Sequence, residues 1–210
     1  MYKKYLKRII DFILSLGGII CLCIPMAIVA IAIKLDSKGP VLFKQKRVGM
    51  GKTHFQIWKF RTMRTDTPKD APTHELSDPD KWITRTGRIL RKTSLDELPQ
   101  LFNILAGHMS VIGPRPALWN QYDLIEERDK YGANDVRPGL TGLAQISGRD
   151  ELEIDVKARL DGEYVEKMSF AFDVKCFLGT IKSVLKSEGV VEGGTGELNK
   201  NNQEKEEVTE

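Results

Sequence analysis

The chain has 210 residues, of which 41% are hydrophobic and 29% charged, a balance that fits one modest folded domain and excludes a disordered protein. Its net charge of +3 is uneven, because residues 188–210 hold seven glutamates and two lysines. Residues 1–187 therefore carry a charge of +8, which predicts anionic partners such as phospholipid headgroups, nucleotides or nucleic acid. The three cysteines lack the spacing of a disulfide framework or a zinc site.

Residues 12–33 form an apolar run without a charged side chain, long enough as a helix to reach across the roughly 30 Å hydrocarbon core of a bilayer. Pro25 falls in the middle of the run, where its ring and its missing N–H predict a bend or a break. Basic residues flank both ends, whereas a single span normally leaves one side poorer in lysine and arginine. The residues alone leave open whether the segment spans the membrane or enters and leaves on the same side.

Asp11 lies at the edge of this run, where a charge is costly in lipid unless it is paired. Arg8 precedes it by three residues, so the two side chains share one face of a helix. The sequence therefore predicts an Arg8–Asp11 ion pair.

Two extended segments, residues 41–47 and 53–60, flank the turn GMGK (residues 49–52) and predict a β-hairpin. The hairpin delivers the sequence KFRTM (residues 59–63) at its exit. The stretch 65–80 is rich in proline, aspartate and threonine, which predicts a surface loop or a lid.

The sequence SLDELPQ (residues 94–100) contains two adjacent carboxylates, Asp96 and Glu97, between a basic cluster and an apolar run. Residues 86–105 predict two short helices, with Asp96 near the N-terminus of the second, where unpaired N–H groups favour anions. A capping box between Ser94 and Glu97 is the purely structural explanation of the glutamate. Two neighbouring acids beside this much positive charge suit phosphate and metal chemistry.

Two stiff turns, GPRP (residues 113–116) and RPGLTG (residues 137–142), hold Arg115 and Arg137. An arginine in a rigid turn loses little entropy when it binds phosphate, although a solvated charge explains either residue as well. Further on, apolar residues recur at helical spacing over residues 170–185. Such a stripe packs on a core or, with its basic flanks, lies on a membrane surface.

Several blocks, taken together and in order, resemble the bacterial sugar transferases, the small monotopic phosphoglycosyl transferases that begin polysaccharide and glycoprotein glycan assembly. The resemblance extends from residue 2 to about residue 189. It rests on KRIID (residues 7–11), Pro25, VLFKQ (41–45), KFRTM (59–63), residues 94–103, GPRP (113–116) and VRPGLTG (136–142). Many relatives carry an Asn-Ala-Ile-Ser-Trp-like stretch where this chain reads DELEI (residues 150–154), so the identity of the donor sugar cannot be transferred.

The resemblance implies transfer of a sugar 1-phosphate from a UDP-sugar to polyprenyl (undecaprenyl) phosphate, with release of UMP and with Mg²⁺ as cofactor. Asp96 is then the nucleophile that forms an aspartyl-phosphosugar intermediate, Glu97 is its partner carboxylate, and both are candidate metal ligands. The residues expected to bind substrate phosphate are Lys59, Arg61, Arg91, Arg115 and Arg137. The implied location is the cytoplasmic face of the bacterial inner membrane, with anionic lipid and a second copy of the chain as further candidate partners.

The expected fold is α+β and mainly helical, in three parts. The resemblance implies a re-entrant helix-break-helix over residues 1–36 and one small catalytic domain, with a short β-hairpin and surface amphipathic helices, over residues 37–188. The composition predicts a disordered acidic tail over residues 189–210. A membrane-tethered scaffold that binds anionic lipid without catalysis is the alternative, and turnover of UDP-sugars separates the two. Nucleic-acid binding is not expected, because the positive residues lie in turns and membrane flanks without a motif that reads RNA or DNA.

Overall fold

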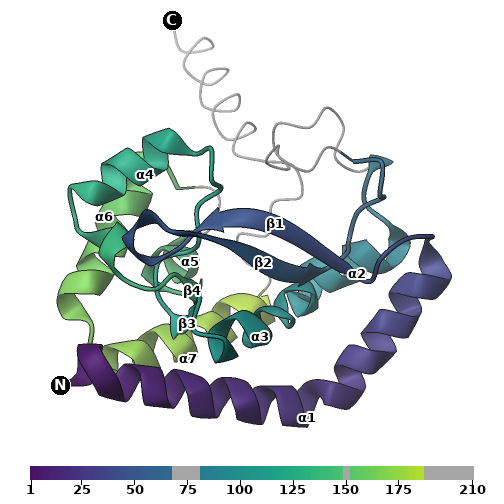
Figure 1. The fold of residues 1–210 in the computed structure, drawn as a ribbon, viewed down its shortest axis with the longest axis horizontal. Helices are drawn as coiled ribbons and strands as arrows, with labels where there is room; N and C mark the ends of the chain where they lie inside the picture. Colours follow the sequence, from purple (N-terminus) through teal and green to yellow (C-terminus); the bar gives the residue numbers. More distant parts are fainter. Residues whose placement is uncertain (68–80, 149–151, 187–210) are drawn as a thin grey trace, which may run out of the picture.

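The computed structural model describes residues 1–67, 81–148 and 152–186, and within these residues the expected α+β, mainly helical architecture is confirmed. A long N-terminal helix runs beneath and beside a body that contains a β-hairpin, a second small sheet and several shorter helices (Figure 1). The α-helices and β-strands are α1 (Lys7–Asp36), β1 (Leu42–Val48), β2 (His54–Phe60), α2 (Arg85–Thr93), α3 (Gln100–Leu105), β3 (Ser110–Ile112), α4 (Tyr122–Asp129), β4 (Gly139–Thr141), α5 (Leu143–Ser147), α6 (Ile154–Lys167) and α7 (Phe170–Lys186).

The helix α1 is long and apolar enough to cross a membrane by length and composition. Pro25 lies inside it, and the backbone stays helical on both sides of the proline. Figure 1 shows that α1 is bent partway along its length, as expected where a proline ring crowds the preceding turn and removes an N–H. The predicted break is thus a bend in a continuous helix.

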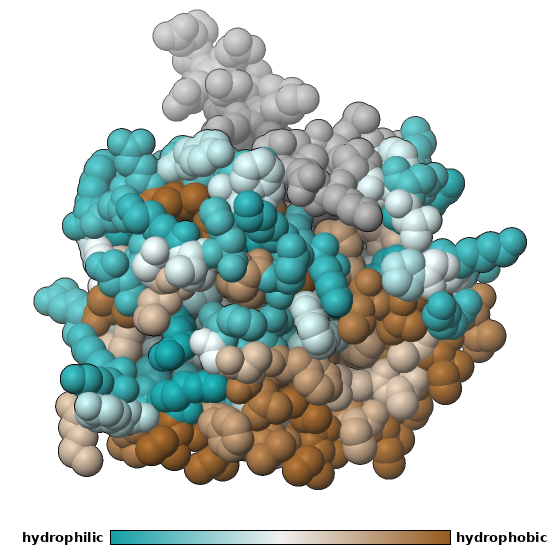
Figure 2. Space-filling view, in the orientation of Figure 1, coloured by the Kyte–Doolittle hydropathy of each residue, from teal (hydrophilic) through white to brown (hydrophobic). Residues whose placement is uncertain are grey.

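One side of α1 is exposed and apolar. Figure 2 shows a continuous apolar band along the lower side of the molecule, where α1 lies. The large exposed side chains of α1 are Ile9, Phe12, Ile13, Leu14, Leu16, Ile20, Ile24, Ile28, Ile31 and Leu35. An apolar face of this size on a soluble surface is unfavourable, which supports association of the protein with a membrane.

Polar side chains near the start of α1 attach the helix to the rest of the protein. Asp11 is buried, and its two oxygens accept hydrogen bonds from the hydroxyl of Ser110 (2.8 Å) and the N–H of Val111 (2.9 Å). Arg8 donates to two carbonyls at the C-terminal end of α3, at 2.6 and 2.9 Å. The predicted Arg8–Asp11 ion pair is therefore wrong, because each side chain has a partner far along the chain.

The predicted β-hairpin is confirmed. Strands β1 and β2 pair antiparallel, with Leu42 opposite Phe60 and Val48 opposite His54. Strand β2 packs on α3, and the end of β2 lies close to the turn that precedes α3. The core cluster at this contact contains Phe55, Ile57, Leu101, Ile104 and Met109.

A second sheet joins the two arginine-bearing turns, because β3 and β4 pair in parallel. A Cβ added to Gly142 would lie 2.1 Å from the carbonyl oxygen of Gly113, and a Cβ added to Gly113 would lie 2.6 Å from that of Arg137. No side chain fits between these segments, so glycine is required for their backbones to approach this closely.

The remaining helices complete the body. Arg128 of α4 and Asp161 of α6 form a buried ion pair, with Nε 2.8 Å from Oδ2. The helix predicted over residues 170–185 is confirmed as α7. Residues 68–80 of the predicted loop and the predicted tail, residues 189–210, lie outside the described residues.

Candidate active site

The two adjacent carboxylates lie in a tight turn between α2 and α3. Ser94 ends α2 in the left-handed conformation (φ 56°), and residues Leu95–Glu97 then form a single 3-10 turn, η5. Pro99 follows as the N-cap of α3, where its missing N–H costs no helical hydrogen bond. The side chain of Ser94 makes no capping bond, so the alternative explanation of Glu97 as part of a capping box does not hold.

Glu97 is bound by two cationic side chains from different parts of the chain. Lys59 Nζ, at the end of β2, lies 2.8 Å from Glu97 Oε1, and Arg115 Nη2 lies 2.9 Å from the same oxygen. The side chains of Lys59 and Glu97 are each only 17% exposed, so water screens this ion pair weakly. The fold thus brings together residues that are far apart in the sequence, as the phosphate-site hypothesis requires.

These charges shift the two carboxyl groups in opposite directions. Burial raises the pKa of Glu97, but Arg115 and Lys59 outweigh burial and hold that pKa well below its usual range. Burial also raises the pKa of Asp96, and the negative charge of Glu97 adds to this rise. Lys59, Arg91 and Arg115 lower the pKa of Asp96 without cancelling the rise. Glu97 is therefore the fixed anion of the pair, and Asp96 is the more basic carboxylate.

Arg91 is held beside the pair by a strand-exit residue. Its Nε donates to Thr62 Oγ1 at 3.0 Å, and α2 is pressed against the backbone of Thr62 at Gly87. The motif KFRTM thus contributes both Lys59 and Thr62 to the surroundings of the carboxylates.

The two other predicted phosphate ligands lie elsewhere. Arg61 is buried, and its three guanidinium nitrogens donate to the carbonyls of Ser37, Lys38 and Pro40 at 2.7–3.1 Å. Arg137 donates from Nε to the carbonyl of Gly107 at 3.0 Å, beyond the end of α3 that is remote from Asp96. The structure does not bring either arginine to the carboxylate pair.

Sequence reasoning did not single out Asn103 or Thr62 as site residues. Asn103 is buried on α3 and bonds to the backbone of β2, while Thr62 bonds to Arg91. Both lie inside the blocks that carry the family resemblance, which is the signal that pointed toward them.

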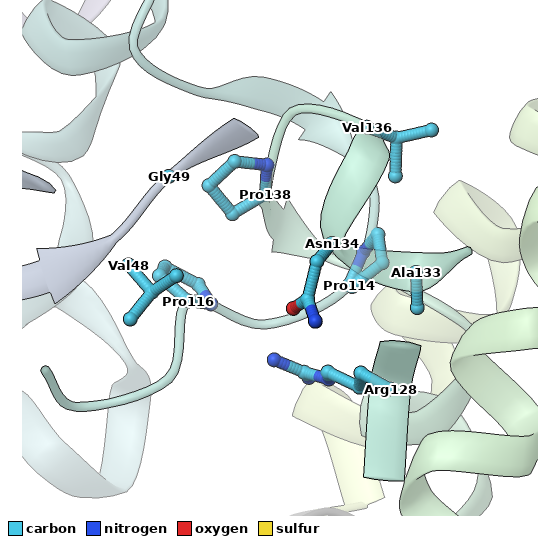
Figure 3. A pocket seen from close by; sticks show the side chains of 9 residues that line it. All are labelled: Val48, Gly49, Pro114, Pro116, Arg128, Ala133, Asn134, Val136 and Pro138. Carbon is cyan, nitrogen blue, oxygen red and sulfur yellow. The ribbon is translucent and has the colours of Figure 1, made fainter. Parts of the chain in front are cut away.

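A small cavity lies behind the loop that carries Arg115. Pro114 and Pro116 line it, and Figure 3 shows the guanidinium of Arg128 and the amide of Asn134 on its polar side. The cavity has room for about one water molecule. The cavity is therefore too small for a sugar nucleotide and is no substrate site.

The carboxylate pair is the candidate metal site. Within residues 1–67, 81–148 and 152–186, no three His, Cys, Asp or Glu side chains gather around one point. Mg²⁺ commonly takes one or two carboxylates and completes its shell with substrate phosphate and water. Asp96 and Glu97 are therefore the residues that would hold such an ion.

Comparison with known sequences gives the family. The sequence profile described as bacterial sugar transferase matches residues 2–187. The chain belongs to the bacterial sugar transferase family. This sugar transferase is 38% identical over 185 residues to the uncharacterized sugar transferase EpsL of Bacillus subtilis (strain 168), covering 88% of this chain and 90% of the relative.

Other relatives of this sugar transferase differ in length. The exopolysaccharide production protein PSS of Rhizobium leguminosarum bv. phaseoli is 42% identical over 192 residues, 86% of this chain and 95% of that protein. The undecaprenyl-phosphate glucose phosphotransferase of Komagataeibacter xylinus is also 42% identical, over 84% of this chain but only 35% of the relative. This sugar transferase therefore corresponds to nearly the whole of some relatives and to about a third of another.

Proposed function

We propose that this sugar transferase moves a sugar 1-phosphate from a UDP-sugar to polyprenyl phosphate through a covalent intermediate on Asp96. The observation that carries the proposal is the pair Asp96–Glu97, which lies among three cationic side chains and next to the apolar helix α1. The names of relatives such as the undecaprenyl-phosphate glucose phosphotransferase of Komagataeibacter xylinus agree with this reaction class. A route to exopolysaccharide or capsule is the expected use of the product.

In the first step, a carboxylate oxygen of Asp96 attacks the β-phosphorus of the donor. The bond from the β-phosphorus to the bridging oxygen breaks, and UMP leaves with the electron pair. The raised pKa of Asp96 helps here, because a more basic oxygen is a stronger nucleophile. In the second step, an oxygen of polyprenyl phosphate attacks the same phosphorus and releases the carboxylate of Asp96.

The cationic side chains offset the electrostatic repulsion between the carboxylates and the diphosphate. Lys59 and Arg115 already bind Glu97, and Arg91 lowers the pKa of Asp96, so all three act on the carboxylate pair. Charge on the transferring phosphoryl group is stabilised by such pre-placed cations. Mg²⁺ held by Asp96 and Glu97 would neutralise the diphosphate further when it is bound.

The position of the pair beside α1 suits a lipid-linked acceptor. Leu98, two residues after Asp96, packs against a cluster that includes Leu22 and Met26 of α1, on either side of Pro25. A phosphate at the membrane surface, with its prenyl chain in the lipid, can therefore approach Asp96 without leaving the bilayer.

We infer that the protein is monotopic. Lys7 near the start of α1 binds Asp173 of α7 at 2.6 Å, and Asp36 at its end accepts a hydrogen bond from the N–H of Thr86 at 3.0 Å. Both ends of α1 are thus tied to one folded body, and a straight span would separate them across the bilayer. The bend at Pro25 lets the helix enter and return on the same side, the cytoplasmic face of the inner membrane.

The helix α7 is the second element expected to touch the membrane. It is joined to the start of α1 by the Lys7–Asp173 ion pair. Its large exposed apolar side chains are Phe170, Val174, Phe177, Leu178 and Ile181. Lys175 and Lys182 flank this stripe, and such a basic amphipathic helix favours an anionic lipid surface.

The test is turnover by the purified chain in nanodiscs that contain Mg²⁺, undecaprenyl phosphate and one UDP-sugar at a time. We expect UMP release with at least one donor, an Asp96→Asn variant that releases none, and a mass adduct of one sugar phosphate on Asp96 when the acceptor is withheld. Undiminished UMP release by Asp96→Asn refutes Asp96 as the nucleophile. Tight binding to anionic vesicles without turnover of any donor supports the scaffold alternative instead.

A further inference from the structure

Asn103 occupies the open edge of β2. The sheet that contains β2 has two strands among the described residues, so one edge of β2 pairs with β1 and the other faces α3. On that second edge, the N–H of Trp58 donates to Asn103 Oδ1 at 2.9 Å, and Asn103 Nδ2 donates to the carbonyl of Gln56 at 2.8 Å. The side-chain amide thus offers β2 the same acceptor and donor that a third strand would offer.

These two bonds are made in the interior. Asn103 is 4% exposed, so water is not available to replace either bond. The helix that carries Asn103 is itself fixed, because Arg8 donates to two carbonyls at the end of α3. The two hydrogen bonds of Asn103 therefore fix the position of β2 relative to α3.

The position of β2 decides where Lys59 can reach. Lys59 directly follows Trp58, and its Nζ lies 2.8 Å from Glu97 Oε1. Glu97 in turn precedes Asn103 by six residues in a segment of one tight turn and one short helix. The segment from Glu97 to Asn103 is thus joined to β2 at two points, by the Asn103 amide and by the Lys59–Glu97 ion pair. The amide of Asn103 therefore fixes the distance between the lysine and the carboxylate.

We propose that Asn103 is a positioning residue for the Lys59–Glu97 ion pair, and through it for the reaction at Asp96. The expected effect of Asn103 on turnover rests on the proposed function. The expected effect of Asn103 on the Lys59–Glu97 ion pair does not. Asn103 itself does not touch substrate.

The first test compares Asn103→Leu, which keeps the approximate size and removes both hydrogen bonds, with Ile104→Val and Ile104→Ala. Ile104 is the next residue of α3, is fully buried and lies outside the carboxylate site. Its variants therefore serve as controls that lose as much stability as Asn103→Leu without a change at the carboxylates. We expect kcat of Asn103→Leu to fall about 10- to 100-fold with KM for the donor changed less than about threefold, because the reacting groups are misplaced. An equal loss of kcat in an Ile104 variant of the same Tm overturns the proposal.

The second test needs no turnover. Thermal unfolding of Lys59→Met, Glu97→Gln and the double variant gives the coupling between the two side chains, measured in the wild-type and in the Asn103→Leu background. We expect the coupling to fall by at least about half when Asn103 is replaced, and an unchanged coupling overturns the proposal. If wild-type protein turns over no donor, the proposed function fails while this measurement still decides the role of Asn103.

A milder variant covers the case in which Asn103→Leu does not fold. Asn103→Ser removes the amide without adding charge or apolar bulk, and it leaves space in which water can bond the N–H of Trp58 and the carbonyl of Gln56. We expect its kcat and its Lys59–Glu97 coupling to lie between those of wild type and Asn103→Leu. Wild-type values of both quantities in Asn103→Ser count against the proposal.

Discussion

The variant Gly87→Ala adds one methyl group and tests how α2 is packed beside the candidate active site. A Cβ at this position would lie 2.0 Å from the carbonyl oxygen of Thr62, 2.7 Å from its carbon and 2.8 Å from its Cα. Because non-bonded atoms prefer separations of about 3.5 Å, Gly87→Ala must push α2 away from Thr62 by about 1 Å or more. The bond between Arg91 Nε and Thr62 Oγ1, now 3.0 Å, would then be too long to hold.

The magnitude follows from three contributions. Alanine gains about 1 kcal/mol over glycine inside a helix. Overpacking costs about 1–3 kcal/mol, and loss of a hydrogen bond to a charged group costs about 1.5–3 kcal/mol. We therefore expect Gly87→Ala to lower the free energy of unfolding by about 3 kcal/mol. Because Arg91 moves with α2, we also expect UMP release to fall about 100-fold.

Gly17 provides the matched control. It also lies inside a helix, and a Cβ added there meets nothing within 4 Å. Thermal unfolding in nanodiscs and a UMP-release assay on both variants should therefore show Gly17→Ala at or slightly above wild type. If Gly87→Ala is as stable and as active as Gly17→Ala, the close packing of α2 on Thr62 does not position Arg91, and the reasoning is refuted.

Two further predictions concern charged side chains. Arg61→Lys should lower Tm and leave KM for the donor unchanged, because Arg61 holds three backbone carbonyls; a raised KM at wild-type Tm would mean that Arg61 binds phosphate after all. Glu97→Gln should be less stable than wild type at neutral pH. Since Lys59 and Arg115 lower the folded-state pKa of Glu97, the wild-type advantage is complete above the ordinary carboxyl pKa of 4.5 and is lost as pH falls through the lowered folded value. Unfolding curves of both proteins from pH 7 to pH 3 measure this difference, and a constant gap contradicts the assignment.

Local sequence signals predicted the parts of the site that depend on neighbouring residues. The alternation of side chains in residues 53–60 predicted the β-hairpin, which the structure confirms. The adjacent acids Asp96 and Glu97 beside basic residues predicted phosphate and metal chemistry. The sequence also predicted two short helices with Asp96 near the start of the second, and the structure places Asp96 in η5, four residues before α3 begins at Gln100. These features need no knowledge of distant contacts.

The sequence could not show which arginines reach the carboxylates. Arg61 and Arg115 both lie in motifs of the family, yet Arg61 turns to carbonyls 21–24 residues earlier while Arg115 reaches Glu97. The difference arises from how the hairpin folds back on the end of α1, which is a tertiary contact. The parallel pairing of β3 and β4 was missed for a similar reason, because three-residue strands carry almost no periodic signal.

The long-range bonds of α1 have a consequence for the order of events during synthesis. Lys7 is bonded to Asp173, 166 residues later, and Asp11 to Ser110, 99 residues later. At roughly 5–20 residues per second, the ribosome supplies the partner of Lys7 on the order of ten seconds or more after the lysine itself. The groups that tie α1 to the body are therefore supplied only after α1 itself has been synthesised, so α1 is available to a membrane before the body closes around it.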